Sequence, residues 1–180
     1  MKELEYPFDA AYIIKKRKSL KKALLADGTS RIRKKIAVFG GSTTSDIVKT
    51  LELFLLDAGI EPEFYESEYA QYFQDAMFPD ETLLSFKPDI VFIHTTNRNV
   101  TDWPEMTDTT EQIDEKLHTE INRFTAMWKS IAEKFHCPII QNNLKCRFTA
   151  CSAAATRGTS TAARIPHALK RSFLRLRTRK

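Results

Sequence analysis

Short strand-like segments alternate with longer segments whose apolar residues recur every three to four positions. Strands are expected at 36–39, 61–65, 90–93 and 138–141. Helices are expected at about 10–26, 47–58, 83–86 and 111–135. This alternation predicts an α/β fold with a parallel sheet. Right-handed crossovers and a switch point beside the first strand predict the strand order 2-1-3-4.

The boundaries of the first helix are marked by its flanking residues. Asp9 is expected to be the N-cap, and Gly28 lies just beyond the C-terminal end. A second segment is rich in aromatic side chains at helical spacing, with members Tyr69, Tyr72, Phe73, Met77 and Phe78. Core packing is the predicted role of this aromatic segment, and a substrate-binding wall is the alternative.

A tight polar turn separates the first strand from the helix that follows. It is formed by Gly40, Gly41, Ser42, Thr43 and Thr44. Glycine allows the backbone angles of such a turn, and the free N–H groups at the start of the helix face any negative charge near the Ser42 hydroxyl. A nucleophile or an anion site is built in this way at the carboxyl edge of a parallel sheet. A plain turn that closes a βα unit is the alternative.

A second polar segment, His94-Thr-Thr-Asn-Arg-Asn99, directly follows the third predicted strand. Loops after parallel strands open on the same edge of a sheet. If the first and third strands are neighbours, Ser42 and Asn97 therefore face one crevice. An Asn amide in that place can donate to a developing oxyanion, whereas an ordinary turn residue is the alternative.

The two polar segments resemble sequence blocks of SGNH (GDSL-type) hydrolases. Gly40-Gly41-Ser42-Thr43-Thr44 is similar to the Gly-Asp-Ser-x-Thr block, and Thr95-Thr96-Asn97-Arg98 is similar to the Gly-x-Asn-Asp block. Over about residues 1–143, longer phrases together resemble the SGNH-like N-terminal region of FkbH-like proteins: KIAVFGGSTTSDI, EFYESEYAQYFQDAMF, KPDIVFIHTTNRN and CPIIQNN. In that family the region precedes a phosphatase-like domain of the haloacid dehalogenase superfamily (subfamily IIIC).

The resemblance implies a fold and roles for the site residues. It implies a three-layer α/β/α domain of flavodoxin/SGNH type over 1–143, with an N-terminal helical segment (1–30) packed on it. Ser42 would be the nucleophile, with Asn97 and the Gly41 backbone N–H as oxyanion donors. Ligand-binding roles are implied for Gly40, Thr43, Thr44, His94, Thr96 and Arg98. No metal ligand is assigned, and Mg²⁺ is expected only for the phosphatase-like domain, which this chain lacks.

Three departures from the hydrolase blocks limit what the resemblance implies. Gly41 replaces an Asp of the first block, and Arg98 replaces the Asp that follows Asn97 in the second. The late Asp-x-x-His block that supplies the general base of SGNH enzymes is absent. His94 lies in the right crevice but comes directly after a strand. We therefore expect little or no ester hydrolysis.

The resemblance implies acyl or glyceryl transfer, or ester hydrolysis, in polyketide or surface-glycan biosynthesis. The implied substrate is a small molecule or an acyl group bound to a carrier protein, and no nucleic-acid partner is expected. A non-catalytic module that binds an anion through His94 and Arg98 is the first alternative. A non-functional fragment is the second. The sequence leaves the oligomeric state open.

The last part of the chain has a different composition. All 23 acidic residues lie at or before Glu133, whereas residues 144–180 contain 10 of the 28 Lys and Arg residues and no acid. The net charge is therefore 18 − 23 = −5 over 1–143 and +10 over 144–180. A basic arm for nucleic acid or membrane is one interpretation. A disordered or non-native tail is the expectation here, because little apolar surface offsets the ordering entropy.

A frameshift explains this change in composition. When the third base of each codon is joined to the first two of the next, residues 144–153 can encode Phe-Glu-Met-Pro-Phe-Tyr-Arg-Leu-Leu-Gly. This phrase is expected after CPIIQNN in the family that the chain resembles. Thr161-Ala162-Ala163 can likewise encode the expected His-Gly-Arg. The sheet is then expected to be incomplete at its C-terminal edge, with the fifth strand beyond the seam.

The remaining features are those of an ordinary globular domain. The 180 residues are enough for one core. No apolar run approaches the roughly 20 residues of a membrane span. The three cysteines have no paired spacing, which predicts a reducing compartment and hence a cytoplasmic location.

Overall fold

The computed structural model describes residues 1–105 and 107–143. In chain order its elements are η1 (Lys2–Leu4), α1 (Ala10–Ala26), β1 (Ile32–Gly40), α2 (Ser45–Asp57), β2 (Ile60–Glu66), α3 (Tyr72–Met77), α4 (Glu81–Phe86), β3 (Ile90–His94), η2 (Asn97–Asn99), α5 (Thr110–Phe135) and β4 (Ile139–Gln141). The predicted tail at 144–180 and the proposed frameshift lie outside the described residues.

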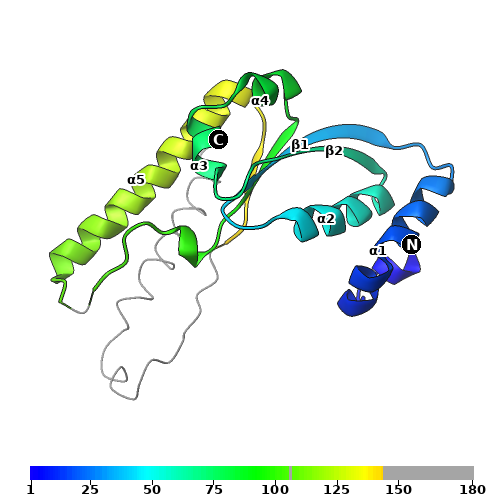
Figure 1. The fold of residues 1–180 in the computed structure, drawn as a ribbon, viewed down its shortest axis with the longest axis horizontal. Helices are drawn as coiled ribbons and strands as arrows, with labels where there is room; N and C mark the ends of the chain where they lie inside the picture. The colour runs from blue at the N-terminus through cyan, green and yellow to red at the C-terminus, as the bar shows by residue number, and fades with distance from the viewer. Residues whose placement is uncertain (106, 144–180) are drawn as a thin grey trace, which may run out of the picture.

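Four parallel strands form one sheet in the order β2-β1-β3-β4 (Figure 1). The predicted α/β class and the predicted order are confirmed. β1 is central, and its residue Ile36 lies opposite Phe64 of β2 and Ile90 of β3. Because β1 and β3 are neighbours, the segments that follow them open side by side at the carboxyl edge of the sheet.

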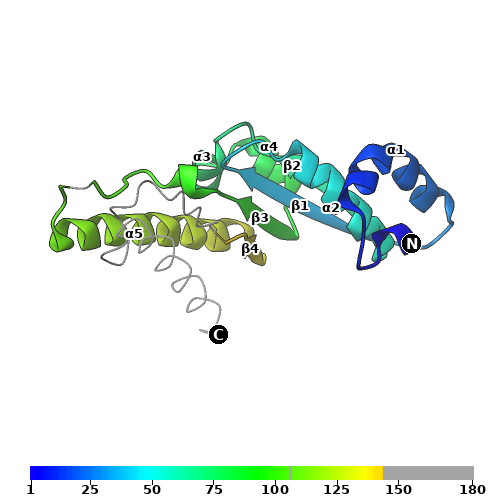
Figure 2. The ribbon, with the colours of Figure 1, turned by 90° about the horizontal axis from the view of Figure 1, so that it is seen from below.

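Helices cover both faces of the sheet. Ala37 and Phe39 of β1 belong to the larger core, which contains Phe124, Met127 and Ile131 of α5. Ile36 and Val38 point to the opposite face, where they pack with Val48 of α2. The sheet therefore separates two helical layers, and α5 and α1 lie toward opposite ends of the molecule (Figures 1 and 2).

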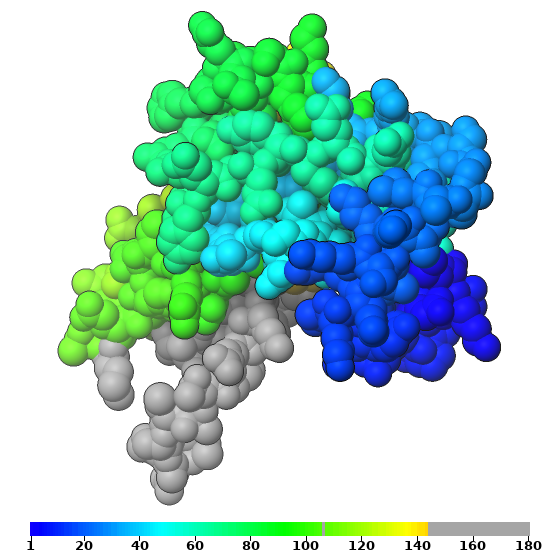
Figure 3. All heavy atoms as spheres, turned by 45° about the vertical axis from the view of Figure 1, so that its right-hand side comes forward, coloured from blue at the N-terminus to red at the C-terminus, as the bar shows by residue number. Residues whose placement is uncertain are grey.

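The first helix packs on α2 and not on the sheet. Leu20 and Leu24 of α1 share a buried cluster with Leu53 and Leu56 of α2. Figure 3 shows α1 and the preceding residues gathered at one end of the molecule, against α2. The helix begins after Asp9, whose carboxylate accepts from the Tyr12 N–H at 3.0 Å, so the predicted N-cap is confirmed.

The aromatic segment around α3 is buried only in part. Tyr72 is 5% exposed and Phe73 packs against the larger core. Tyr69 and Phe78 are 74% and 79% exposed, so core packing was a wrong prediction for these two. The helix has only six residues, and these two side chains lie beyond its ends, where the chain leaves the helical path.

The long helix α5 has the predicted position. Its N-cap Thr109 and Gln112 form a capping box, and it ends at His136, which has a left-handed φ of 50°. The buried residues of α5 are Ile113, Glu120, Phe124, Met127, Ser130 and Ile131. Glu120 is the one charged member of this set. Within the described part of the chain, no helix is long and apolar enough to cross a membrane.

Candidate functional site

The carboxyl ends of β1 and β3 bring the two polar segments together. Gly40 lies opposite His94 in the parallel register. One residue further on, the Gly41 N–H donates to the His94 carbonyl at 2.8 Å. Ser42 and Asn97 therefore follow adjacent strands at the same edge, as predicted.

Ser42 and His94 form the central pair of this edge. The Ser42 Oγ lies 3.4 Å from Nδ1 of His94, and both residues are half-buried. This is a long hydrogen bond, of the kind that tightens when a substrate is present. The pair has the geometry of a hydroxyl nucleophile beside a base.

Burial controls the protonation of His94. Desolvation lowers the pKa of this imidazole below its usual 6.5, because the charged form loses hydration. His94 is therefore neutral at pH 7 and able to accept a proton. Among the described residues, the Ser42 hydroxyl is the one hydrogen-bond partner of the His94 ring. No carboxylate of the described chain contacts this ring.

The turn before Ser42 is held by Asn99. The Asn99 amide Nδ2 donates to the Gly41 carbonyl at 2.8 Å. The Oδ1 of the same amide accepts from the Thr96 backbone N–H at 2.8 Å. A Cβ at Gly41 would lie 2.5–2.6 Å from the Asn99 amide atoms. This close approach explains why glycine occupies the position where the hydrolase block has Asp.

The oxyanion role expected for the Gly41 N–H does not match its contacts, because this N–H is already bonded to the His94 carbonyl. The next two N–H groups of the turn, those of Ser42 and Thr43, have no hydrogen-bond partner within 1–105 and 107–143. Free N–H groups beside a nucleophile are suitable donors to a developing oxyanion. The turn therefore offers such donors one and two residues later than expected.

The remaining residues predicted for the site lie around the same edge. Asn97 begins η2 and is half-buried, and its side chain makes no hydrogen bond within the described chain. Thr96 caps η2 through its side chain. Arg98 is exposed, and its guanidinium has no ion-pair partner among the residues described. A Cβ at Gly40 would lie 2.8 Å from the Thr44 methyl carbon, so this glycine serves the tight turn.

A carboxylate occupies the start of α2. Thr44 is the N-cap of this helix, but its hydroxyl donates to Glu66 Oε1 at 2.8 Å and caps no backbone N–H. Glu66 comes from the end of β2. Its negative charge therefore lies near the positive end of the helix dipole, where it is favourable.

Sequence reasoning missed three residues near this edge: Asn99, Glu120 and Arg123. Asn99 stands two residues after Asn97 in the same polar segment, and the order of polar residues does not show which of the two contacts the Ser42 turn. Glu120 and Arg123 lie on α5, far from the loop in sequence. Glu120 occupies a position of the apolar stripe, so a charged residue at a core position was the available signal.

Replacing Gly41 with Ala is expected to destabilise the domain by about 1–3 kcal/mol, because the new methyl group overpacks against Asn99. Urea unfolding of the variant and the wild type measures this cost. The double variant Gly41→Ala/Asn99→Ala removes the obstructing amide and should cost less than the sum of the two single changes. A Gly41→Ala protein as stable as the wild type would contradict this explanation of the glycine.

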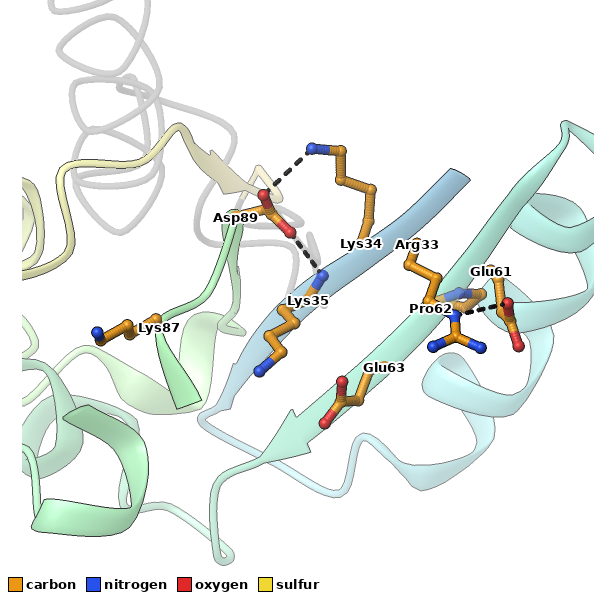
Figure 4. A pocket seen from close by; sticks show the side chains of 8 residues that line it. All are labelled: Arg33, Lys34, Lys35, Glu61, Pro62, Glu63, Lys87 and Asp89. Carbon is orange, nitrogen blue, oxygen red and sulfur yellow. Dashed lines mark hydrogen bonds and ion pairs between the residues drawn. The ribbon is translucent and has the colours of Figure 1, made fainter. Parts of the chain in front are cut away.

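A hollow of about 700 Å³ lies at the opposite, amino edge of the sheet (Figure 4). It is lined by Arg33, Lys34, Lys35, Glu61, Pro62, Glu63, Lys87 and Asp89. Most of its charges are paired: Lys34 contacts Asp89 at 3.1 Å and Arg33 contacts Glu61 at 3.3 Å. The Lys35 backbone N–H, followed by the Lys34 ammonium, lowers the pKa of Asp89. These contacts join the beginnings of strands, and the Ser42–His94 pair is at the other edge.

Comparison with known proteins supports the fold. No protein-family model and no curated protein matches the chain. The chain is similar to the crystal structure of the N-terminal part of the protein BF1531 from Bacteroides fragilis, which contains a phosphatase domain and is complexed with Mg. The TM-score is 0.66 at 18% identity, over 89% of this chain and 42% of that chain. This chain thus spans less than half of that structure, and the likeness shows a shared fold.

Residues 1–105 and 107–143 contain no group of three or more His, Cys, Asp or Glu side chains that could hold a metal ion.

Proposed function

We propose that this chain is the SGNH-like N-terminal region of an FkbH-like protein, and that its Ser42–His94 pair accepts an acyl or glyceryl group. The Ser42 hydroxyl 3.4 Å from a half-buried, neutral imidazole is the observation that carries the proposal. The structural likeness to a protein part that contains a phosphatase domain supports it as well. A phosphatase-like domain beside the SGNH-like region is the domain organisation that the sequence resemblance implies.

In the proposed reaction, Ser42 Oγ attacks the carbonyl carbon of an ester or thioester. Its proton passes to Nδ1 of His94, which then protonates the departing alkoxide or thiolate. The acyl group remains on Ser42 until an acceptor hydroxyl or water removes it. The free N–H groups of Ser42 and Thr43 and the Asn97 amide are the proposed donors to the oxyanion.

Slow turnover is part of this proposal. In SGNH enzymes, which the chain resembles, a late Asp-x-x-His block supplies the base, and it is absent here. No carboxylate within the described chain orients the His94 ring. An unoriented base accelerates proton transfer less than an oriented one. The expected product is therefore a long-lived acyl group on Ser42.

The alternative of a non-catalytic anion site is separated from this proposal by covalent labelling of Ser42, which an anion-binding module would not undergo. The Glu66 carboxylate, which accepts from the N-cap Thr44 of α2 at 2.8 Å, would disfavour a bound anion and an oxyanion alike, because both are negative. The alternative of a non-functional fragment is tested separately by the coding DNA across codons 140–165.

Labelling with a fluorophosphonate probe tests the proposal. We expect one probe per chain, located on the peptide that contains Ser42, and no such adduct in Ser42→Ala. Ser45→Ala is the matched control, because Ser45 lies in the same turn region and is not hydrogen-bonded to a histidine. An adduct that persists in Ser42→Ala, or a wild-type chain that takes up no probe, would refute the proposed site.

A further inference from the structure

A buried ion pair on α5 lies behind the loop that follows β3. Glu120 has no exposed surface, and its Oε2 accepts from Arg123 Nε at 3.1 Å and Nη2 at 2.9 Å. The other carboxylate oxygen, Oε1, accepts from the backbone N–H of Thr101 at 2.8 Å and from its hydroxyl. Both oxygens are therefore satisfied, which a buried carboxylate requires.

Arg123 reaches from this pair to the backbone beside the site. Its Nη2 donates to the Asn99 carbonyl at 2.6 Å, and its Nη1 donates to the Tyr72 hydroxyl at 3.0 Å. The guanidinium also lies 5.4 Å from the ring centre of Phe73 and 4.8 Å from that of Phe124. Planar stacking and fixed donors restrict its orientation. The Asn99 carbonyl is therefore held from the α5 side by a rigid group.

Asn99 transmits this restraint to the nucleophile. Its backbone carbonyl is bonded to Arg123, and its side-chain Nδ2 is bonded to the carbonyl of Gly41, the residue directly before Ser42. The path from α5 to the turn thus consists of two consecutive hydrogen bonds through one residue. No substrate contact is needed for any member of this path.

We infer that Glu120 and Arg123 are positioning residues that fix the Ser42 hydroxyl against His94, acting through Asn99. The kinetic part of this inference rests on the proposed function. A displacement of about 1 Å in a reacting group can cost on the order of 100-fold in rate. The Ser42–His94 separation is already long, so a looser turn would separate the pair further.

The test uses the double variant Glu120→Gln/Arg123→Met in the full chain. Both changes keep side-chain volume, and together they leave no unpaired buried charge, so the fold is retained. We expect fluorophosphonate labelling of Ser42 to slow by about 10- to 100-fold, with unchanged affinity for the probe. Arg31→Met is the matched control. Arg31 is 7% exposed and donates to Leu24, Leu56 and Asp27 at the amino edge, so its loss lowers stability without slowing labelling.

A second variant tests the path through Asn99. Asn99→Asp keeps the side-chain shape but replaces the donor to Gly41 with an acceptor, and it should slow labelling to a similar degree. Adding the double change to Asn99→Asp should then slow labelling by less than about 2-fold, since residues on one path are not additive. A fully additive loss would overturn the inference. So would an equal loss in Arg31→Met.

Amide hydrogen exchange separates this inference from the proposed function. In the double variant, exchange of the Gly41 amide, which is hydrogen-bonded to the His94 carbonyl, should be about 10-fold faster than in Arg31→Met, as expected for a locally opened turn. If the wild-type Ser42 is not labelled but this exchange difference is found, the positioning role stands and the proposed function fails. Equal exchange in the two proteins overturns the positioning role, whatever the labelling shows.

Discussion

Replacing His94 with Ala is expected to slow covalent modification of Ser42 by about 10²-fold, the lower end of the range that a general base contributes, because no carboxylate within the described chain orients its ring. In the structure the His94 ring nitrogen Nδ1 is the hydrogen-bond partner of the Ser42 hydroxyl, and burial keeps the ring neutral. Labelling rates measured with a fluorophosphonate at pH 7 provide the test. His118→Ala is the matched control, because His118 is exposed on α5. Equal rates in the two variants would remove His94 from the mechanism.

The same pair predicts a pH dependence with a definite sign. The reactive form of His94 is neutral, so the labelling rate should rise with pH through the pKa of His94 and then level off. Because burial lowers this pKa below 6.5, the midpoint of the rise should lie below pH 6.5. In His94→Ala this rise should disappear. A midpoint above pH 6.5 in the wild type would show that His94 is less buried than described.

Replacing Arg123 with Met is expected to destabilise the domain by about 3–5 kcal/mol, because it leaves a buried charge without its partner. Glu120 is fully buried, and Arg123 is its one cationic partner among the residues described. Guanidinium-induced unfolding at pH 7 measures the loss. The double variant Glu120→Gln/Arg123→Met should recover most of it, since a neutral pair carries no desolvated charge.

A surface ion pair supplies the control for this prediction. The side chains of Arg33 and Glu61 are 87% and 47% exposed, and such pairs contribute about 0–1 kcal/mol. Arg33→Met should therefore leave stability nearly unchanged. A cost of Arg123→Met as small as that of Arg33→Met would show that the buried ion pair between Glu120 and Arg123 is the wrong description.

The sheet and its order could be predicted because the buried parts of the strands are apolar and the strands alternate with helices. The limits of β1 could not. The strand begins at Ile32, and its first half contains Arg33, Lys34 and Lys35, which pair with β2 while their side chains reach solvent. A search for buried strands finds only the apolar half at 36–39. Exposed strand ends carry no such pattern.

The candidate site could be predicted in part. Ser42 and His94 follow directly from the ends of two strands, and strand order alone brings them to one edge. The choice between Asn97 and Asn99 depends on the path of η2, which a polar segment does not determine. The contacts of Glu120 and Arg123 depend on the way α5 packs against that loop, over sequence separations of 19 and 24 residues. In the sequence, a charged residue within the apolar stripe of α5 was the only indication of these contacts.

Reaction with p-nitrophenyl acetate tests the central claim most directly, because it forms the proposed acyl group. Released nitrophenol and intact protein mass would be followed together in wild type, Ser42→Ala and His94→Ala. The Ser42–His94 site predicts a burst of up to one equivalent, one acetyl group on the Ser42 peptide, and slow release afterwards. Acetylation spread over lysines to the same extent in wild type and Ser42→Ala, with no acetyl group on Ser42, would contradict the claim.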